Sequence, residues 1–322
     1  MYKNTVTQSL GTPPLLPFTI VVGGANLDIV AHADAPLVLS DSNPGHVRCA
    51  PGGVGRNIAH NLARLGHAPA LVSVLGQDAF GQTVLEATRA AGVDTRWCMP
   101  LAGARTATYL SLHGRDGDMA VAINDMDILA RLDATLLQPL APVFQAARCL
   151  VLDCNLHDAA LAFLLGSRFA APVLVDAVSA IKCPRLLPWL AQVHTLKVNA
   201  LEATALTGLA VYTPQDAQHA CQHLHARGVA QVVLSLGAQG VAWCDAQGRT
   251  GFLAARHVPV VNTSGAGDAL LAGLVHGHLQ GWSLAQSVPW AMACAEITLQ
   301  SPVANAPDLS VAAVQARLPA TG

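Results

Sequence analysis

Six short apolar runs, separated by segments with helical spacing, constrain the fold of this 322-residue chain more than any other feature. The runs are rich in Val, Leu and Ile, and they span 18–24, 70–76, 149–155, 172–178, 194–199 and 231–237. Apolar residues recur with helical spacing in 54–66, 80–91, 157–169, 201–207, 214–227, 265–280 and 284–299. Apolar strands that alternate with helices indicate a mostly parallel α/β sheet covered by helices on both faces. Pro289 in the last helical segment predicts a kink or a break there.

Two segments depart from this alternation. The segment 31–51 has no helical period, and 105–124 has the pattern of two strands around the polar turn "HGRDGD". Both fit a small antiparallel sheet that lies off the main domain. The expected main domain is then made of 18–30, 52–104 and 125–322. Residues 1–17 lack the continuous apolar stretch of a signal peptide, so they are expected to form a flexible N-terminal tail.

Composition excludes several classes of protein. Lys and Arg number 18 against 20 Asp and Glu, for a net charge of −2, and no basic run is present, which argues against a nucleic-acid partner. No stretch of 18 apolar residues is uninterrupted, which argues against a membrane span. The eight cysteines form no CxxC pair, so neither a zinc site nor a disulfide framework is expected. A cytoplasmic location fits these features.

The stretch "VVNTSGAGDALLAGL" (260–274) places a carboxylate directly behind a glycine turn, where a helix is expected to begin. The first N–H groups of a helix have no internal partner and carry partial positive charge, and glycines allow an anion to approach them. Asp268 is therefore either a helix-charge residue or a base beside an anion site. A P-loop is excluded because no glycine is followed by lysine. The absence of a third glycine in 53–58 and 265–270 disfavours an NAD-dependent dehydrogenase.

Four further motifs carry polar residues where strands end or helices begin. They are "GGANLD" (23–28), "GGVGRNIAHNLARLG" (52–66), "KVNALEATALTG" (197–208) and "LSLGAQG" (234–240). Each has a structural alternative: a strand-end turn, a helix cap, a capping box and a hairpin turn, respectively. "GGANLD" is expected to place Asn26 and Asp28 at the carboxyl end of the first strand, where α/β sheets bind ligands.

The order and wording of these motifs resemble the ribokinase family of pfkB-type carbohydrate kinases, from about Phe18 to about Leu309. "GGVGRNIAHNLARLG" resembles the first signature of that family and "NTSGAGDALLAGL" the second. Within the family, "SNPG" (42–45), "INDMDI" (123–128) and "TLQSP" (298–302) are most similar to the pseudouridine kinase branch.

The resemblance implies a Rossmann-like main domain and a β-sheet lid, the latter matching 31–51 and 105–124. It implies ATP-dependent transfer of a phosphoryl group to the 5′-hydroxyl of a ribosyl compound, most readily pseudouridine. Free ribose or another nucleoside is the alternative acceptor, and a non-catalytic ligand-binding regulator on the same fold is a remote alternative.

The resemblance also implies roles for single residues. Asp268 matches the catalytic base, and Gly265, Ala266 and Gly267 match the anion hole. Sugar-contacting positions are Asn26, Asp28, Gly52, Gly53 and Asn57. Nucleotide-contacting positions are Asn199, Ser235, Gly237 and Gly240, and Asn199 with Glu202 matches the motif that organises Mg²⁺, here through water.

Three points stay open in the sequence. The second signature commonly opens with an Asp that helps to hold a monovalent cation, and Asn262 stands there, so reduced cation binding is expected. Along 105–112 either Thr106 and Thr108 or Arg105 and Tyr109 point inward, and Asp153 and Asn155 are plausible contacts without an assigned role. An exposed edge of the lid is a candidate surface for a homodimer.

Overall fold

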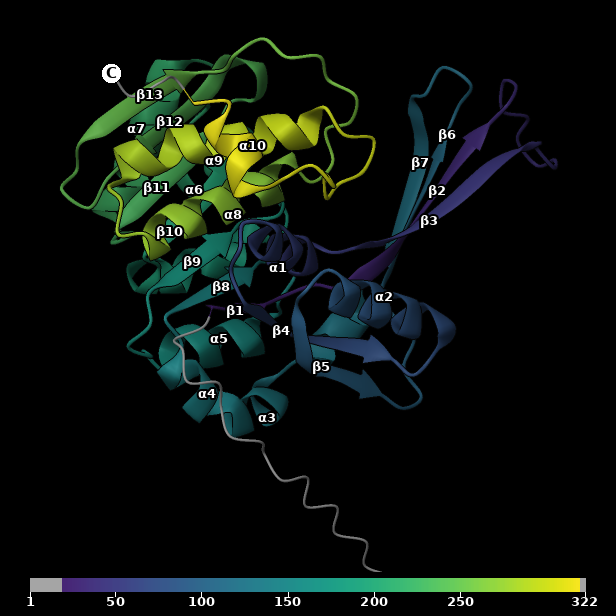
Figure 1. Cartoon of the computed structure of the whole chain (residues 1–322), viewed down its shortest axis with the longest axis horizontal. Helices are drawn as coiled ribbons and strands as arrows, with labels where there is room; N and C mark the ends of the chain where they lie inside the picture. Colours follow the sequence, from purple (N-terminus) through teal and green to yellow (C-terminus); the bar gives the residue numbers. More distant parts are fainter. Residues whose placement is uncertain (1–18, 319–322) are drawn as a thin grey trace, which may run out of the picture.

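The computed structural model describes residues 19–318, and the tail expected at 1–17 lies outside them (Figure 1). Within this range the strands form a nine-stranded main sheet and a separate four-stranded sheet, here called the lid. Every helix within 19–318 is too short or too polar to cross a lipid bilayer.

The main sheet has the strand order β13-β12-β11-β10-β9-β8-β1-β4-β5. Its strands are β1 Thr19–Val22, β4 Pro69–Gly76, β5 Asp94–Leu101, β8 Cys149–Asp153, β9 Val173–Asp176, β10 Thr195–Asn199, β11 Gln231–Ser235, β12 Gly240–Cys244 and β13 Thr250–Ala254. All neighbours from β5 to β11 are parallel, whereas β12 and β13 add an antiparallel edge. The six predicted strands and the mostly parallel sheet are confirmed. The sequence analysis did not predict β5, β12 and β13.

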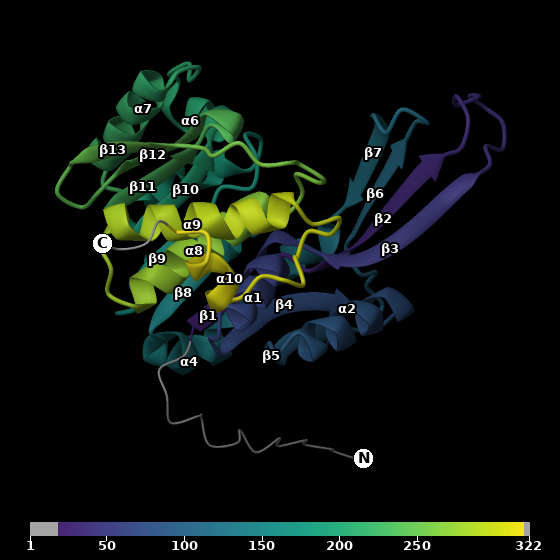
Figure 2. The ribbon, with the colours of Figure 1, turned by 45° about the horizontal axis from the view of Figure 1, so that its top comes forward.

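Helices cover both faces of this sheet (Figure 2). The longer ones are α1 Val54–Arg64, α2 Ala79–Ala90, α5 Asp158–Gly166, α6 Ala200–Thr207, α7 Pro214–Ala226, α8 Ala266–Leu279 and α9 Leu284–Leu299. The 3₁₀-helices and the shorter α-helices are η1 Asp127–Arg131, α3 Ala134–Leu137, η2 Gln138–Leu140, α4 Ala141–Ala146, η3 Cys183–Gln192, η4 Gly237–Gln239 and α10 Val311–Gln315. The seven predicted helices are confirmed, and α9 does not break at Pro289.

The alternation of side chains along the buried strands separates two cores. Ile20 and Val22 of β1 belong to the core that includes residues of α5, α6 and α7, whereas Val21 belongs to the core that includes residues of α1, α8 and α9. Successive side chains of a strand point to opposite faces, so a strand between two helical layers must be apolar at every position. This is why the apolar runs predict the sheet.

The lid has the order β3-β2-β6-β7 and projects from the main domain (Figure 1). Its strands are β2 Asn26–Ala33, β3 Gly45–Gly52, β6 Thr108–His113 and β7 Met119–Asp125. The pairs β2–β3 and β6–β7 are antiparallel, but β2 and β6 are parallel, so the lid is mixed and not purely antiparallel as expected.

The lid also begins earlier than the expected boundary at residue 31. The chain turns directly from β1 into β2, so Asn26 and Asp28 lie at the base of a lid strand. The expectation that they end a strand of the main sheet is therefore wrong. β1 and β2 follow one another closely in the sequence. Only the strands with which they pair show that they belong to different sheets.

Candidate active site

The candidate site lies at the carboxyl ends of the main strands, beside β1, where the order reverses between β8 and β4. Open α/β sheets bind ligands at such a switch point. The helix α8 begins there at Ala266, and Gly265 before it has φ of 80°. A Cβ at Gly265 would overlap the carbonyl of Ala304, so this turn requires glycine. The predicted glycine turn at a helix N-terminus is thus present.

Asp268, in the first turn of α8, is buried with 8% of its surface exposed. Its Oδ2 accepts a hydrogen bond of 2.9 Å from Nδ2 of Asn57 on α1, a residue 211 positions earlier in the chain. Burial and the nearby Asp176 carboxylate raise the pKa of Asp268 to about 7, against the opposing effects of Asn57 and Lys197. A carboxylate with such a pKa is suited to accept and return protons near neutral pH.

Lys197 lies beneath the glycine turn and was not singled out by sequence reasoning. Its Nζ is 3.0 Å from Oδ2 of Asp176 on β9, and a Cβ at Gly267 would lie only 2.7 Å from that Nζ. Burial lowers the pKa of Lys197, but the carboxylates of Asp176, Glu202 and Asp268 outweigh it and raise the pKa. A lysine between the apolar residues Leu196 and Val198 of the strand "TLKVN" was the available signal.

Asn26 and Asp28 meet at the base of the lid. Nδ2 of Asn26 donates to Oδ1 of Asp28 at 2.6 Å, and any Cβ at Gly52 would overlap the Asp28 carboxylate. Burial raises the pKa of Asp28, with the Asn26 hydrogen bond and the charge of Arg56 opposing it. Gly53 has φ of 100° and its α-carbon lies against the carbonyl of Gly24, so a turn and a close approach both require glycine.

Asp153 has a structural role here. It is fully buried, and its Oδ2 accepts N–H groups of Gly24 at 2.8 Å and Gly55 at 2.7 Å. Its Oδ1 accepts the N–H of Asn155 at 2.8 Å. The Asp153 carboxylate therefore ties the turn after β1 to the start of α1, the helix that carries Asn57.

Asn199 and Glu202 form the capping box of α6. Oδ1 of Asn199 accepts from the N–H of Glu202 at 2.9 Å, and Oε2 of Glu202 accepts from the N–H of Asn199 at 2.8 Å. The structural alternative is therefore realised for this motif. Nδ2 of Asn199 also donates to Oε1 of Glu202 at 2.7 Å, so each side-chain oxygen of the pair accepts one hydrogen bond within the box. These oxygens lie at the end of β10, next to Ser235, which pairs with Asn199 in the register of β11.

Gly237 and Gly240 form the β11–β12 hairpin, with φ of 57° and 130°. A Cβ at Gly240 would overlap the carbonyl of Leu253 on β13, so strand packing accounts for this glycine. The hairpin alternative is realised here too. No hydrogen bond within residues 19–318 joins this turn to Asp268.

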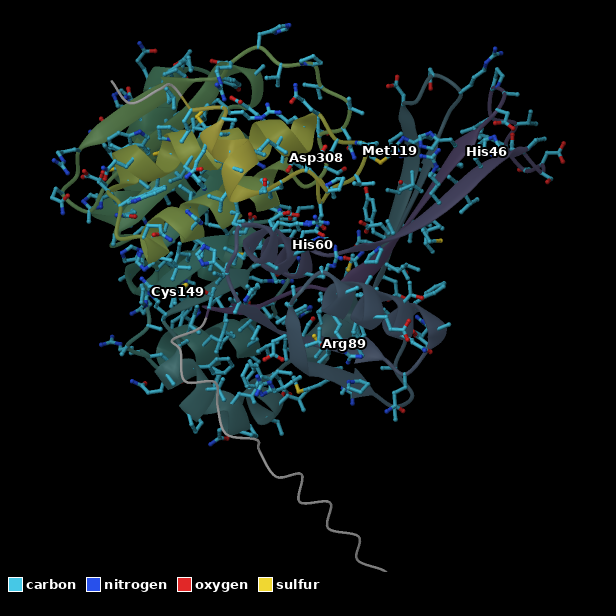
Figure 3. The ribbon with its side chains drawn as sticks, in the orientation of Figure 1. His46, His60, Arg89, Met119, Cys149 and Asp308 are labelled. Carbon is cyan, nitrogen blue, oxygen red and sulfur yellow. The ribbon has the colours of Figure 1, made fainter. Side chains whose placement is uncertain are left out.

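The register of the lid separates a polar from an apolar face. Asp28 pairs with Tyr109, which pairs with Asn124, so these three side chains share one face. Figure 3 shows Met119 on the side of the lid that faces the main domain, and its Sδ lies 3.6 Å from the hydroxyl of Tyr109. By this register the inner face includes Asn26, Asp28, Val30, His32, Arg48, Tyr109, Ser111, His113, Met119 and Asn124. The outer face includes Ile29, Val47, Thr108, Leu110, Val121 and Ile123.

Neither of the two alternatives for residues 105–112, inward-pointing Thr106 and Thr108 or inward-pointing Arg105 and Tyr109, holds in full. Tyr109 lies on the inner face, but Arg105 is exposed and forms an ion pair with Asp125 at 2.9 Å. Thr106 is buried and its hydroxyl donates to Asp78 at 2.6 Å. Thr106 and Arg105 therefore fix the segment that connects β5 of the main sheet to β6 of the lid.

Comparison with known proteins decides the family. The model of the pfkB family of carbohydrate kinases matches residues 17–310. This chain belongs to that family. It is 41% identical to the pseudouridine kinase of Escherichia coli (strain K12) over 92% of this chain and 95% of the relative. It is 40% identical to an uncharacterized sugar kinase of the same strain, over 91% of this chain and 81% of the relative.

The fold agrees with this membership. A ribokinase of Arabidopsis thaliana superimposes with a TM-score of 0.80 at 23% identity, over 93% of this chain and 98% of that one. The pfkB kinase described here therefore has the α/β ribokinase fold predicted from its sequence. It is an ATP-dependent phosphotransferase with an alcohol acceptor, acting on a sugar or a nucleoside. The dehydrogenase and regulator alternatives are wrong.

Proposed function

We propose that this kinase transfers the γ-phosphoryl group of ATP to the 5′-hydroxyl of pseudouridine. The 41% identity to a pseudouridine kinase supports this acceptor. Free ribose or another nucleoside is the alternative acceptor. It is supported by the 40% identity to an uncharacterized sugar kinase and by the 25% identity to a guanosine-inosine kinase.

The observation that carries phosphoryl transfer is the buried Asp268 in the first turn of α8, with a pKa raised to about 7 by burial and by Asp176. Asp268 accepts the proton of the 5′-hydroxyl while the oxygen of that hydroxyl attacks the γ-phosphorus of ATP. The bond between the γ-phosphorus and the β–γ bridging oxygen breaks, and ADP leaves. The N–H groups around Gly265–Gly267 stabilise the charge that spreads over the phosphoryl oxygens. Lys197 beneath Gly267 adds positive charge to the same position.

The donor set beside this turn fits Mg²⁺. Asn199 and Glu202 offer amide and carboxylate oxygens, which are the hard ligands this ion prefers, and Mg²⁺ keeps several waters. We propose that both residues hold the ion through water and that Ser235, Gly237 and Gly240 line the nucleotide position. When bound, the ion neutralises phosphate charge.

Asn26, Asp28 and Asn57 supply donors and acceptors for the ribose hydroxyls, next to Gly52 and Gly53, whose lack of side chains leaves room. Further along the inner face, Tyr109 and Asn124 are neighbours across β6 and β7. We propose that they read the base. Pseudouridine has a C–C glycosidic bond and hence a ring N–H that uridine lacks, and Oδ1 of Asn124 is an acceptor for it.

Two features of assembly and location complete the proposal. The outer face exposes 67% of Val47 and 64% of Ile123, and we propose that it pairs with a second copy of the chain, giving a homodimer through the lid. All eight cysteines are free, and seven are buried, which supports a reducing, cytoplasmic location.

The test of the acceptor is ADP release with Mg²⁺–ATP and a panel of pseudouridine, uridine and free ribose. We expect kcat/KM to be highest for pseudouridine, because a site that hydrogen-bonds an N–H strongly rejects an analogue without it. Equal values for uridine and pseudouridine would support a broad nucleoside kinase. A higher value for ribose would replace the proposal with a ribokinase-like activity.

A further inference from the structure

Arg56 is a buried arginine one position before Asn57, with 4% of its surface exposed. It is held by Thr88, whose Oγ1 accepts from Nε at 3.3 Å, and by the carbonyl of Pro51, which accepts from Nη1 at 3.3 Å. Burial lowers the pKa of Arg56 to about 10, and the charge of Asp28 opposes this shift, so the guanidinium stays protonated at neutral pH.

The contact of Arg56 with Asn57 determines which end of an amide faces the catalytic carboxylate. Nη1 of Arg56 donates to Oδ1 of Asn57 at 3.2 Å, and Nδ2 of Asn57 donates to Asp268 at 2.9 Å. A side-chain amide has an acceptor end and a donor end, and an arginine can only donate. If the Asn57 amide flipped while Arg56 stayed in place, its Nδ2 donor would face the Nη1 donor of Arg56. Its Oδ1 acceptor would then face the carboxylate of Asp268.

We propose that Arg56 is a positioning residue that fixes the amide of Asn57 so that its donor end faces Asp268. This inference rests on the proposed role of Asp268 as the base. The hydrogen-bond network around Arg56 extends to the loop after α9, where Oδ1 of Asn305 accepts from Nη1 of Arg56 at 2.6 Å. Nδ2 of Asn305 donates to the backbone carbonyl of Asn57 at 3.1 Å and to Oδ1 of Asn61 at 3.0 Å. Asn305 therefore holds both Arg56 and the helix α1, which carries Asn57.

The charges that face Asp268 make its one fixed donor important. Burial and the Asp176 and Asp153 carboxylates disfavour its ionised form, and the Asn57 hydrogen bond and the ammonium of Lys197 favour it. A flip of Asn57 would replace this donor with the amide oxygen and so remove its favourable contribution. The base would then be protonated over a wider range of pH.

The direct measurement is the titration of the Asp268 carboxyl carbon by NMR in wild type and in Arg56→Met, which keeps the length of the side chain but removes every donor. We expect the Asp268 pKa to rise by about one unit, the usual scale for loss of a hydrogen bond to the charged form. We expect kcat at pH 7 to fall about fivefold, because the ionised fraction of the base falls by that factor, with the acid limb of the kcat profile shifted the same way. The titration needs no acceptor, so it stands even where the proposed substrate fails.

Three further variants separate positioning from a merely structural role. Arg64→Met, on the exposed side of the same helix, is the matched control and should leave the Asp268 pKa unchanged. Asn305→Ala loosens Arg56 without removing it and should shift the pKa in the same direction by less, which covers the case in which Arg56→Met does not fold. In an Asn57→Ala background Arg56→Met should have no further effect on kcat.

Two results would overturn the inference. One is a folded Arg56→Met or Asn305→Ala protein with an unchanged Asp268 pKa and kcat. The other is an Arg56→Met effect on kcat that is as large without the Asn57 side chain as with it, because the arginine would then act by another route.

Discussion

The main sheet and the lid are both built from short strands, but they differ in how many of their faces are covered. Every residue of β4 and β8 is buried, whereas β3 buries only Gly52, where it leaves the lid. A strand between two helical layers is fixed by packing from both sides, while an exposed sheet is fixed by its hydrogen bonds and its base. The proposed base, Asp268, and the nearby Lys197 belong to the covered region, and the groups proposed to select the nucleobase belong to the exposed one.

The comparison teaches that chemistry and selectivity should be separable in this kinase. Asp28 lies at the junction, on a lid strand but close enough to the main domain to sense the charge of Arg56. Variants in the covered region should act on kcat for every acceptor. Variants further along the lid should act on the choice of acceptor.

The largest effect is expected for Asp268→Asn. Loss of the proposed base should lower kcat by at least roughly 100-fold with every acceptor, the usual scale for a positioned proton acceptor. ATP affinity, measured by calorimetry, should change little because the anion hole is mostly backbone. Asp158→Asn makes the same change in the first turn of α5, away from the site, and is the matched control. Near-normal turnover by Asp268→Asn would restore the helix-charge interpretation of this residue.

The same substitution should stabilise the fold in a pH-dependent way. The pKa of Asp268 is raised from 3.8 to about 7 by burial and by Asp176, so the native state holds its proton more tightly than the unfolded chain does. Stability is therefore lost as pH rises from about 4 to about 7, and the loss is constant above that, on the order of a few kcal/mol. Asp268→Asn should raise the melting temperature clearly at pH 8 and little at pH 5.

Asp78→Asn should behave in the opposite way. Burial raises the pKa of Asp78, but the hydrogen bonds from Thr106 and Gly81 outweigh it and lower the pKa. Its contribution to stability is present above the unfolded pKa, so Asp78→Asn should lower the melting temperature at pH 8. If Asp268→Asn lowers the melting temperature at pH 8, as Asp78→Asn is expected to do, the electrostatic account of Asp268 is wrong.

A smaller, selective effect is expected in the lid. Asn124→Ala should lower kcat/KM for pseudouridine about tenfold, as loss of a specific hydrogen bond does, and should leave ribose phosphorylation unchanged. Ile123→Ala, the neighbouring change on the outer face, should leave acceptor preference as in wild type. Equal losses with pseudouridine and ribose would mean that the lid contributes to catalysis itself and would end the proposed division of roles.

The smallest effect is expected at Asn262, in the loop before α8. Its Oδ1 accepts from the N–H of Ser264 at 2.9 Å and its Nδ2 donates to the carbonyl of Pro302 at 3.3 Å. An amide lacks the full negative charge that favours the binding of hard cations. We expect the wild-type rate to be insensitive to replacing potassium with tetramethylammonium at constant ionic strength. Asn262→Asp should introduce a few-fold activation by potassium, and steep saturable activation of the wild type would contradict this.

Part of the site was predictable because its signals are local. A glycine turn followed by Asp268 at the start of an apolar helix can be recognised from a few consecutive residues. Lys197 was harder to recognise, because one charge in an apolar strand does not reveal which carboxylates surround it. Arg56 lies inside a recognised motif, yet its role depends on Thr88 and Asn305, which are distant in the sequence.

The sequence by itself determined six strands and seven helices of the main domain, the parallel sheet and the glycine turn, since periodicity and backbone freedom act over neighbouring residues. Only the tertiary structure decided that β2 belongs to the lid, that the lid has one polar face, and that Asn57 meets Asp268 across 211 positions. The pKa of Asp268 depends on the same packing, because desolvation and the Asp176 charge arise only when β9, α1 and α8 come together. Contacts between distant residues have no pattern in a single sequence, and these contacts set the chemistry of the site.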